Sequence, residues 1–126
     1  MSETVGAIAE STYVMLTTYR KNGTAVPTPL WAARDGDDLV MWTVGDSWKV
    51  KRLRRDNRVL VQTCDARGKK TSGPEVAGVG EVIDDSSRAA DLIVKKYGIL
   101  GRLTVWGSRI RRGADATVEI RVRDVV

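Results

Sequence analysis

The chain has 126 residues, which suits one domain with a core of its own rather than two domains. It contains no histidine and a single cysteine, Cys64, which excludes Ser-His-Asp and Cys-His nucleophilic sites, a disulfide framework and nearly every zinc site. The formal net charge of +5 favours an anionic partner, and any difficult chemistry must come with a cofactor.

The first predicted elements are three strands in a meander. Residues 13–19 are rich in β-formers and precede an Asn-Gly turn, a second strand runs from residue 25 to about 34, and a third covers 39–44. Pro27 and Pro29 lie two apart in the second strand and lack an N–H, so one edge of that strand cannot be fully paired. That edge is either an ordinary outer edge or a surface against which a flat heterocycle lies.

A short basic helix follows the meander. Asp46 or Ser47 can cap a helix that ends near Arg55, and five Lys or Arg residues fall within positions 49–55. Lys49 lies in the first turn, where its ammonium can join the free amides and the positive end of the helix dipole. With the Ser47 hydroxyl, this arrangement predicts a phosphate site. The alternative is a solvated lysine without a ligand.

The remaining segments complete a mostly β pattern with short helices. We predict strands at 58–64, 75–84 and 116–123, a polar loop at 65–74, a helix that ends near Tyr97 and a weaker helical stretch at 99–110. Six strands, consecutive at first, favour an antiparallel barrel over a doubly wound sheet. No Gly-x-Gly-x-x-Gly sequence follows a strand, so the dinucleotide-binding fingerprint is absent.

Five segments, in this order, carry a family resemblance. They are Tyr-Val-Met-Leu-Thr-Thr at 13–18, Pro-Thr-Pro-Leu-Trp at 27–31, Val-Met-Trp-Thr at 40–43, Ser-Trp-Lys-Val-Lys-Arg-Leu-Arg-Arg-Asp-Asn-Arg-Val at 47–59 and Lys-Tyr-Gly-Ile-Leu-Gly-Arg-Leu at 96–103. Together they resemble the deazaflavin-dependent branch of the pyridoxamine 5'-phosphate oxidase-like family. The resemblance implies that residues 1–126 form one six-stranded antiparallel split β-barrel, similar to FMN-binding barrels, with two cofactors in clefts of a homodimer.

The resemblance also implies a set of cofactor-binding residues, with no catalytic side chain and no metal ligand. They are Thr28, Pro29 and Leu30 at the ring system, Trp42 and Thr43 at the ring or the ribityl chain, Ser47 and Lys49 at the phosphate with Lys51 in support, and Gln62 near the cofactor. Two positions depart from the family pattern. Asn57 replaces a usual proline, and Trp48 stands in the phosphate pocket where a small residue is common.

The function that the resemblance implies is an F420-dependent oxidoreductase, which transfers a hydride between reduced deazaflavin and a small organic acceptor. The alternative is an FMN-binding oxidase or flavin carrier of the same family. Charge favours coenzyme F420, because its polyglutamyl tail extends beyond the phosphate that both cofactors share. Surplus cations are available to attract this tail at Lys51, Arg52, Arg55, Arg109, Arg111 and Arg112.

The expected partners are a second copy of the chain and a small-molecule substrate. The proline edge and the apolar Trp31 and Trp106 favour a twofold dimer. A nucleic-acid partner is not favoured, because the strands lack the interleaved cations and aromatic residues of a base-stacking platform. We expect a cytoplasmic protein with no membrane partner, because no signal peptide and no spanning apolar run is present.

Overall fold

The structure is a computed structural model, and it describes residues 2–112 and 117–123. The strands in this part of the chain are β1 (Tyr13–Tyr19), β2 (Ala25–Leu30), β3 (Ala32–Asp35), β4 (Asp38–Val44), β5 (Arg58–Cys64), β6 (Thr71–Ile83) and β7 (Thr117–Arg123). The helices are α1 (Ser2–Ala9), α2 (Trp48–Arg55), α3 (Ser87–Tyr97) and α4 (Ile99–Arg112). All strand pairs are antiparallel, in one sheet of order β2-β1-β5-β6-β7-β4-β3.

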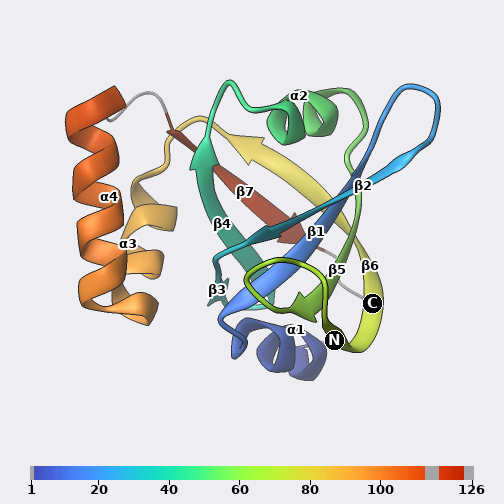
Figure 1. Ribbon diagram of the computed structural model, residues 1–126, viewed down its shortest axis with the longest axis horizontal. Coiled ribbons are helices and arrows are strands. Elements are labelled where there is room, and N and C mark those ends of the chain that lie inside the picture. Colours follow the sequence, from blue (N-terminus) through green and yellow to red (C-terminus); the bar gives the residue numbers. More distant parts are fainter. Residues whose placement is uncertain (1, 113–116, 124–126) are drawn as a thin grey trace.

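One interrupted strand closes the sheet into a barrel. β2 and β3 are the two outermost strands of the sheet, yet only Trp31 separates them in the chain. Val14 of β1 pairs with Leu30 before the interruption, and Met41 of β4 pairs with Ala32 after it. The sequence predicted a single strand over 25–34. The structure has seven strands rather than six in its described part, because the predicted strand is interrupted at Trp31. The fold is a mostly β, antiparallel split β-barrel (Figure 1).

The barrel interior holds the core, and a helix covers each end (Figure 1). Alternate residues of the strands fill the interior, and fully or almost fully buried examples are Val14, Leu16, Leu39, Met41, Val59, Val61, Ile120 and Val122. α2 covers one end with Val50 and Leu53 buried. Gly80 of β6 makes this contact possible, since a Cβ there would lie 2.9 Å from Leu53 Cδ2. The predicted basic helix is therefore held tightly against the sheet.

Two predictions from sequence need correction. α1 was not predicted, because an eight-residue helix is marginal by itself, and it is stabilised by Val5 and Ile8 in the core. The predicted loop at 65–74 is shorter than expected, because β6 already begins at Thr71, which pairs with Cys64. The register of this pairing shifts between Val61 and Thr63, so Gln62 lies at a bulge.

A nearly buried ion cluster joins the outer face of β7 to the β3–β4 turn. Arg121 donates to Glu119 at 3.0 Å, to Asp38 at 2.9 Å and to Asp35 at 2.7 Å. Burial lowers the pKa of Arg121, but these hydrogen bonds outweigh burial and leave its pKa raised. Glu119 is 2% exposed, and its second oxygen, Oε1, has no hydrogen-bond partner among the described residues. Arg121 is therefore the principal counter-charge of a buried carboxylate.

The last two helices lie on one side of the barrel. α3 packs on β3 and β4, and α4 packs on the outer side of α3, at the far left in Figure 1. Gly101 allows the two helices to approach closely, because a Cβ there would lie 2.8 Å from the Ile93 carbonyl oxygen. No helix among the described residues is both long and apolar enough to cross a bilayer.

Candidate functional site

The N-terminal end of α2 carries polar groups that have no hydrogen-bond partner among the described residues. Ser47 precedes the helix in an extended conformation, and its side chain makes no capping hydrogen bond. Its Oγ is buried and has no partner among the residues that the structure describes. The first-turn amides of an α-helix also lack intrahelical acceptors. This end of α2 therefore presents several donors that an anion could use.

Lys49 lies in the same turn and is half-buried. No carboxylate of the described chain lies within ion-pair distance of it. Burial, and then the nearby charge of Arg52, lower the pKa of Lys49 below its ordinary value. A phosphate here would accept from both Lys49 and Ser47, so these two residues fit the phosphate of a flavin-type cofactor.

A basic cavity of about 450 Å³ adjoins this turn, between α2 and the β1–β2 hairpin. Its lining residues are Arg20, Lys21, Trp48, Arg52 and Arg55, and no carboxylate is among them. Arg52 donates to Thr18 Oγ1 at 2.7 Å and Arg55 to the Tyr19 carbonyl at 2.6 Å, so β1 fixes both guanidinium groups. Burial, followed by the charges of Arg20 and Arg55, lowers the pKa of Arg52. The cavity therefore holds an excess of positive charge.

The predicted ring-side residues lie on two faces of the sheet. Met15 of β1 pairs with Pro29 on one side and with Gln62 on the other, so Pro29 and Gln62 share the outer face. Thr28 and Leu30 point to the other face, and Leu30 packs against the core. The prediction that the second strand has an edge that is not fully paired is confirmed. In the described chain, β2 is an outermost strand of the sheet and pairs with β1.

The 65–70 turn closes over this outer face. Gly68 has a φ of +68°, and a Cβ on it would lie 2.7 Å from the end of Met15 and 3.4 Å from the ring of Pro29. Gln62 donates to the Gly73 carbonyl at 2.9 Å, which ties its amide to β6. Pro29 and Gln62 thus flank Met15. Met15 lies three residues from Thr18, the hydrogen-bond partner of Arg52, so the two positions are roughly 10 Å apart along β1.

The other predicted cofactor-binding residues lie on different elements and faces. Thr43 is buried and pairs with Val118, whereas Trp42 points to the opposite face and pairs with Glu119. The ammonium of Lys51 lies 4.6 Å above the Trp48 ring rather than beside Ser47. Neither this cavity nor the second one described below is lined by the predicted ring-side residues. The structure therefore does not gather the predicted ring-side residues around either of these two cavities.

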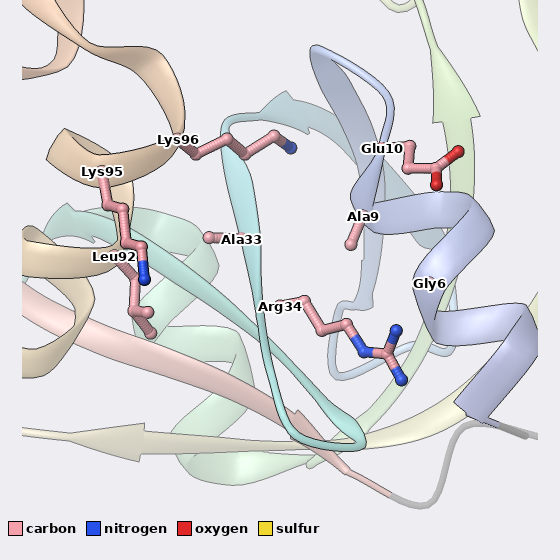
Figure 2. Close-up of a pocket in the computed structure, with 8 residues that line it drawn as sticks. All are labelled: Gly6, Ala9, Glu10, Ala33, Arg34, Leu92, Lys95 and Lys96. Atoms are coloured by element: carbon pink, nitrogen blue, oxygen red, sulfur yellow. The ribbon is translucent and has the colours of Figure 1, made fainter.

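A second cleft, of about 620 Å³, lies between α1 and α3 (Figure 2). Lys96 extends from α3 along one side and donates to the carbonyls of Ser11 at 2.7 Å and Ala32 at 2.5 Å. Burial lowers the pKa of Lys96 to about 8. Arg34, Lys95 and Glu10 also line the cleft, and no sequence pattern predicted that these residues border one cavity (Figure 2).

Tyr97 supports the interruption between β2 and β3. Its hydroxyl donates to the Thr12 carbonyl at 2.7 Å, and its ring stacks on Trp31 with centroids 4.3 Å apart. Burial raises the pKa of Tyr97 to about 12, so the phenol stays protonated at neutral pH. Trp31 is thus covered within its own chain. It contributes less free apolar surface than the sequence suggested.

The described residues contain no group of His, Cys, Asp and Glu side chains that could hold a metal ion. Cys64 is buried, and burial followed by the charge of Asp65 raises its pKa, so this thiol is not activated. The side chains of Arg109, Arg111 and Arg112 lie outside the described part of the chain. Among the polar groups, the end of α2 is therefore the strongest candidate site for an anionic cofactor.

Solved structures of similar fold cover almost the whole chain. One is named F420 reductase, with 22% identity and a TM-score of 0.67 over 95% of this chain and 91% of that one. A conserved hypothetical protein from Mycobacterium tuberculosis has 22% identity and a TM-score of 0.71 over 99% and 82%. General stress protein 26 from Bacillus anthracis has 18% identity and a TM-score of 0.65 over 97% and 87%.

These TM-scores establish a shared fold. No curated protein matches the sequence. The sequence profile described as pyridoxamine 5'-phosphate oxidase matches residues 1–125, which include the split barrel, α2 and the β2 edge. The fold of this family binds flavin-type cofactors, and the family includes oxidoreductases. Because the profile of this family matches nearly the whole chain, the chain belongs to the pyridoxamine 5'-phosphate oxidase family.

Proposed function

We propose that the protein is an F420-dependent oxidoreductase that acts on a small organic acceptor. The observation that carries the proposal is the end of α2, where Ser47 Oγ and Lys49 have no partner among the described residues. Trp48, between them in the chain, lines a cavity with four cations and no carboxylate. The bound deazaflavin would supply the hydride chemistry. The chain's own residues would bind the phosphate, align the ring along β2 and shield it from water.

The basic cavity supports F420 over the FMN alternative. Either cofactor would satisfy Ser47 and Lys49 with its single phosphate group. The four cations that line the cavity, Arg20, Lys21, Arg52 and Arg55, have no carboxylate partner among the described residues, and a polyglutamyl tail would provide one. Each exposed contact of this kind contributes a few tenths of a kcal/mol up to about 1 kcal/mol. The solved structure named F420 reductase is consistent with this choice.

Parallel fluorescence titrations of the purified protein with F420 and with FMN test the proposal. We expect F420 to bind about tenfold more tightly at low salt, from two or three tail contacts. The preference should shrink toward about 0.5 M salt, where exposed charges are screened within a few ångströms. Replacing Arg20 and Lys21 together with alanine should weaken F420 binding and leave FMN binding unchanged. If FMN binds as tightly at low salt, or co-purifies stoichiometrically, the FMN alternative is correct.

We further propose that the working unit is a homodimer. The ring-side residues of one chain, among them Pro29 and Gln62, line neither of the two cavities, and β2 presents an edge that prolines keep from pairing. A single small barrel offers one wall for a tricyclic ring, and a second copy can supply the other. Tyr97 covers Trp31, so the proline edge of β2 supports the dimer better than tryptophan exposure does.

Light scattering coupled to size exclusion checks the assembly. We expect a particle of about twice the 13.8 kDa chain mass at micromolar concentration, with F420 present. Dilution should lower the mass and the affinity for cofactor together, because the second wall of the site leaves with the second chain. A 13.8 kDa particle that still binds the cofactor tightly would contradict the shared cleft.

A further inference from the structure

The outward face of α4 (Ile99–Arg112) concentrates exposed apolar side chains. Of six large apolar residues that are exposed in the described chain, four lie on this helix: Ile99 (77%), Leu100 (66%), Leu103 (57%) and Trp106 (62%). At 100° per residue, all four fall within about 60° of Leu103 around the helix. They therefore form one continuous stripe, which we call the α4 stripe.

Packing against α3 fixes the direction of the α4 stripe. Gly101 and Val105 lie on the opposite side of the helix, where a Cβ on Gly101 would lie 2.8 Å from the Ile93 carbonyl oxygen and Val105 is 5% exposed. α4 is the outermost element on its side of the molecule, on the other side of the barrel from β5 and β6 (Figure 1). The α4 stripe therefore stays exposed even if a second chain covers the face that holds Gln62.

The charge of the segment indicates what covers the stripe. Residues 95–112 include no Asp or Glu, and their cations are Lys95, Lys96, Arg102, Arg109, Arg111 and Arg112. Arg102 is exposed, and its helical position borders the stripe on the Trp106 side. An apolar stripe with tryptophan and flanking cations is the pattern of a helix that lies in a lipid headgroup layer.

We propose that α4 docks the protein on an anionic lipid surface. Ile99, Leu103 and Trp106 would enter the boundary between headgroups and acyl chains, while Arg102 would contact a lipid phosphate and the net positive charge of the segment would favour an anionic surface. The sequence favoured no membrane partner because it contains no spanning segment, but a helix that lies along the interface needs none. The proposal does not depend on the identity of the cofactor.

A second copy of the chain is the other candidate occupant, and charge disfavours it. A twofold contact centred on the α4 stripe would place α4 against α4 of the second copy. The net positive charge of one segment would then lie next to that of the other, with no carboxylate in either segment. Like charges in direct opposition are unfavourable, whereas anionic headgroups neutralise them.

Sedimentation of the full chain with lipid vesicles tests the proposal. We expect binding to vesicles that contain phosphatidylglycerol, about tenfold weaker binding to pure phosphatidylcholine, and loss of the difference in high salt. Equal affinity for both vesicles would overturn the charge argument. Absence of binding to phosphatidylglycerol would overturn the whole proposal.

Matched variants localise the contact. Leu103→Ser combined with Trp106→Ser should weaken binding to phosphatidylglycerol by more than about tenfold, since two apolar side chains no longer enter the layer. Arg102→Gln should weaken it by about fivefold. Trp48→Ser is the control, because Trp48 is 72% exposed and adjoins the cationic cavity of α2. A loss in Trp48→Ser as large as in the double variant would move the contact to α2 and overturn the proposal.

Light scattering without vesicles separates lipid docking from self-association. The Leu103→Ser/Trp106→Ser variant should fold, because both side chains are exposed, and its particle mass should equal that of the parent chain. A fall in mass would identify the α4 stripe as a subunit interface and overturn the lipid assignment.

Discussion

Alanine in place of Lys49 is expected to weaken cofactor binding by about 10- to 100-fold. A hydrogen bond to a charged group contributes about 1.5–3 kcal/mol, and a phosphate at the end of α2 would lose its principal cation. Lys49 is half-buried and has no carboxylate partner in the described chain, so the anion of a ligand is what best stabilises its charged form. Ser47→Ala should cause a smaller loss, of about 3- to 10-fold, because a neutral hydroxyl contributes less.

The matched control for Lys49 is Arg54→Ala in the same helix. Arg54 is 51% exposed and pairs with Asp84 at 2.9 Å, away from the unpartnered Ser47 hydroxyl. Fluorescence titrations with F420 and with FMN should show no change for this variant and a loss of both cofactors for Lys49→Ala. Arg55 cannot serve as the control, because it lines the basic cavity. Equal losses at Lys49 and Arg54 would mean diffuse attraction rather than a phosphate site.

Features that depend on neighbouring residues were predictable from the sequence. β-rich segments bounded by turn residues located β1, β4 and β5 closely. The last strand, predicted from period-two alternation, was confirmed from Thr117, since residue 116 lies outside the described chain. α2 begins and ends where its cap and its basic run predicted, and Ser47 and Lys49 both lie at its N-terminal end. Local sequence was therefore sufficient to place this helix end, whereas its role as a phosphate site stays a prediction.

Features that depend on distant residues were not predictable. The interruption at Trp31 is held by Tyr97, which lies 66 positions later, and no local pattern marks that contact. Arg20 and Lys21 join the basic cavity because the β1–β2 hairpin folds over α2, and helical periodicity cannot reveal this. The exposure of Trp106 likewise follows from the packing of Gly101 on α3. From the sequence, residues 99–110 were predicted only as a weaker helical stretch, with no packing direction.

Methionine in place of Arg121 is expected to lower the free energy of unfolding by about 3–5 kcal/mol, because it leaves a buried carboxylate without its counter-charge. Glu119 is 2% exposed and Arg121 13% exposed, with 3.0 Å between Arg121 Nε and Glu119 Oε2. Urea denaturation measures the change. The control is Arg123→Met two residues along β7, which is 48% exposed and pairs with Glu81 at 2.9 Å. It should cost less than about 1 kcal/mol.

A second substitution separates charge from packing in this cluster. Adding Glu119→Leu to Arg121→Met should recover much of the lost stability, because an apolar pair of similar volume leaves no buried charge uncompensated. A double variant as unstable as Arg121→Met alone would mean that the cost arises from packing instead.

Acid unfolding gives an independent reading of the same cluster. Hydrogen bonds from Arg88, and then from Arg121, lower the pKa of Asp35 from 3.8 to about 2. A carboxyl whose folded pKa is depressed stabilises the fold above its unfolded pKa, and this contribution is lost as pH falls from about 4 toward 2. In Arg121→Met the folded pKa of Asp35 moves back toward 3.8, so less stability remains to be lost over that interval. An acid-dependent loss of the same size in the variant and the parent chain would contradict the role of Arg121 at Asp35.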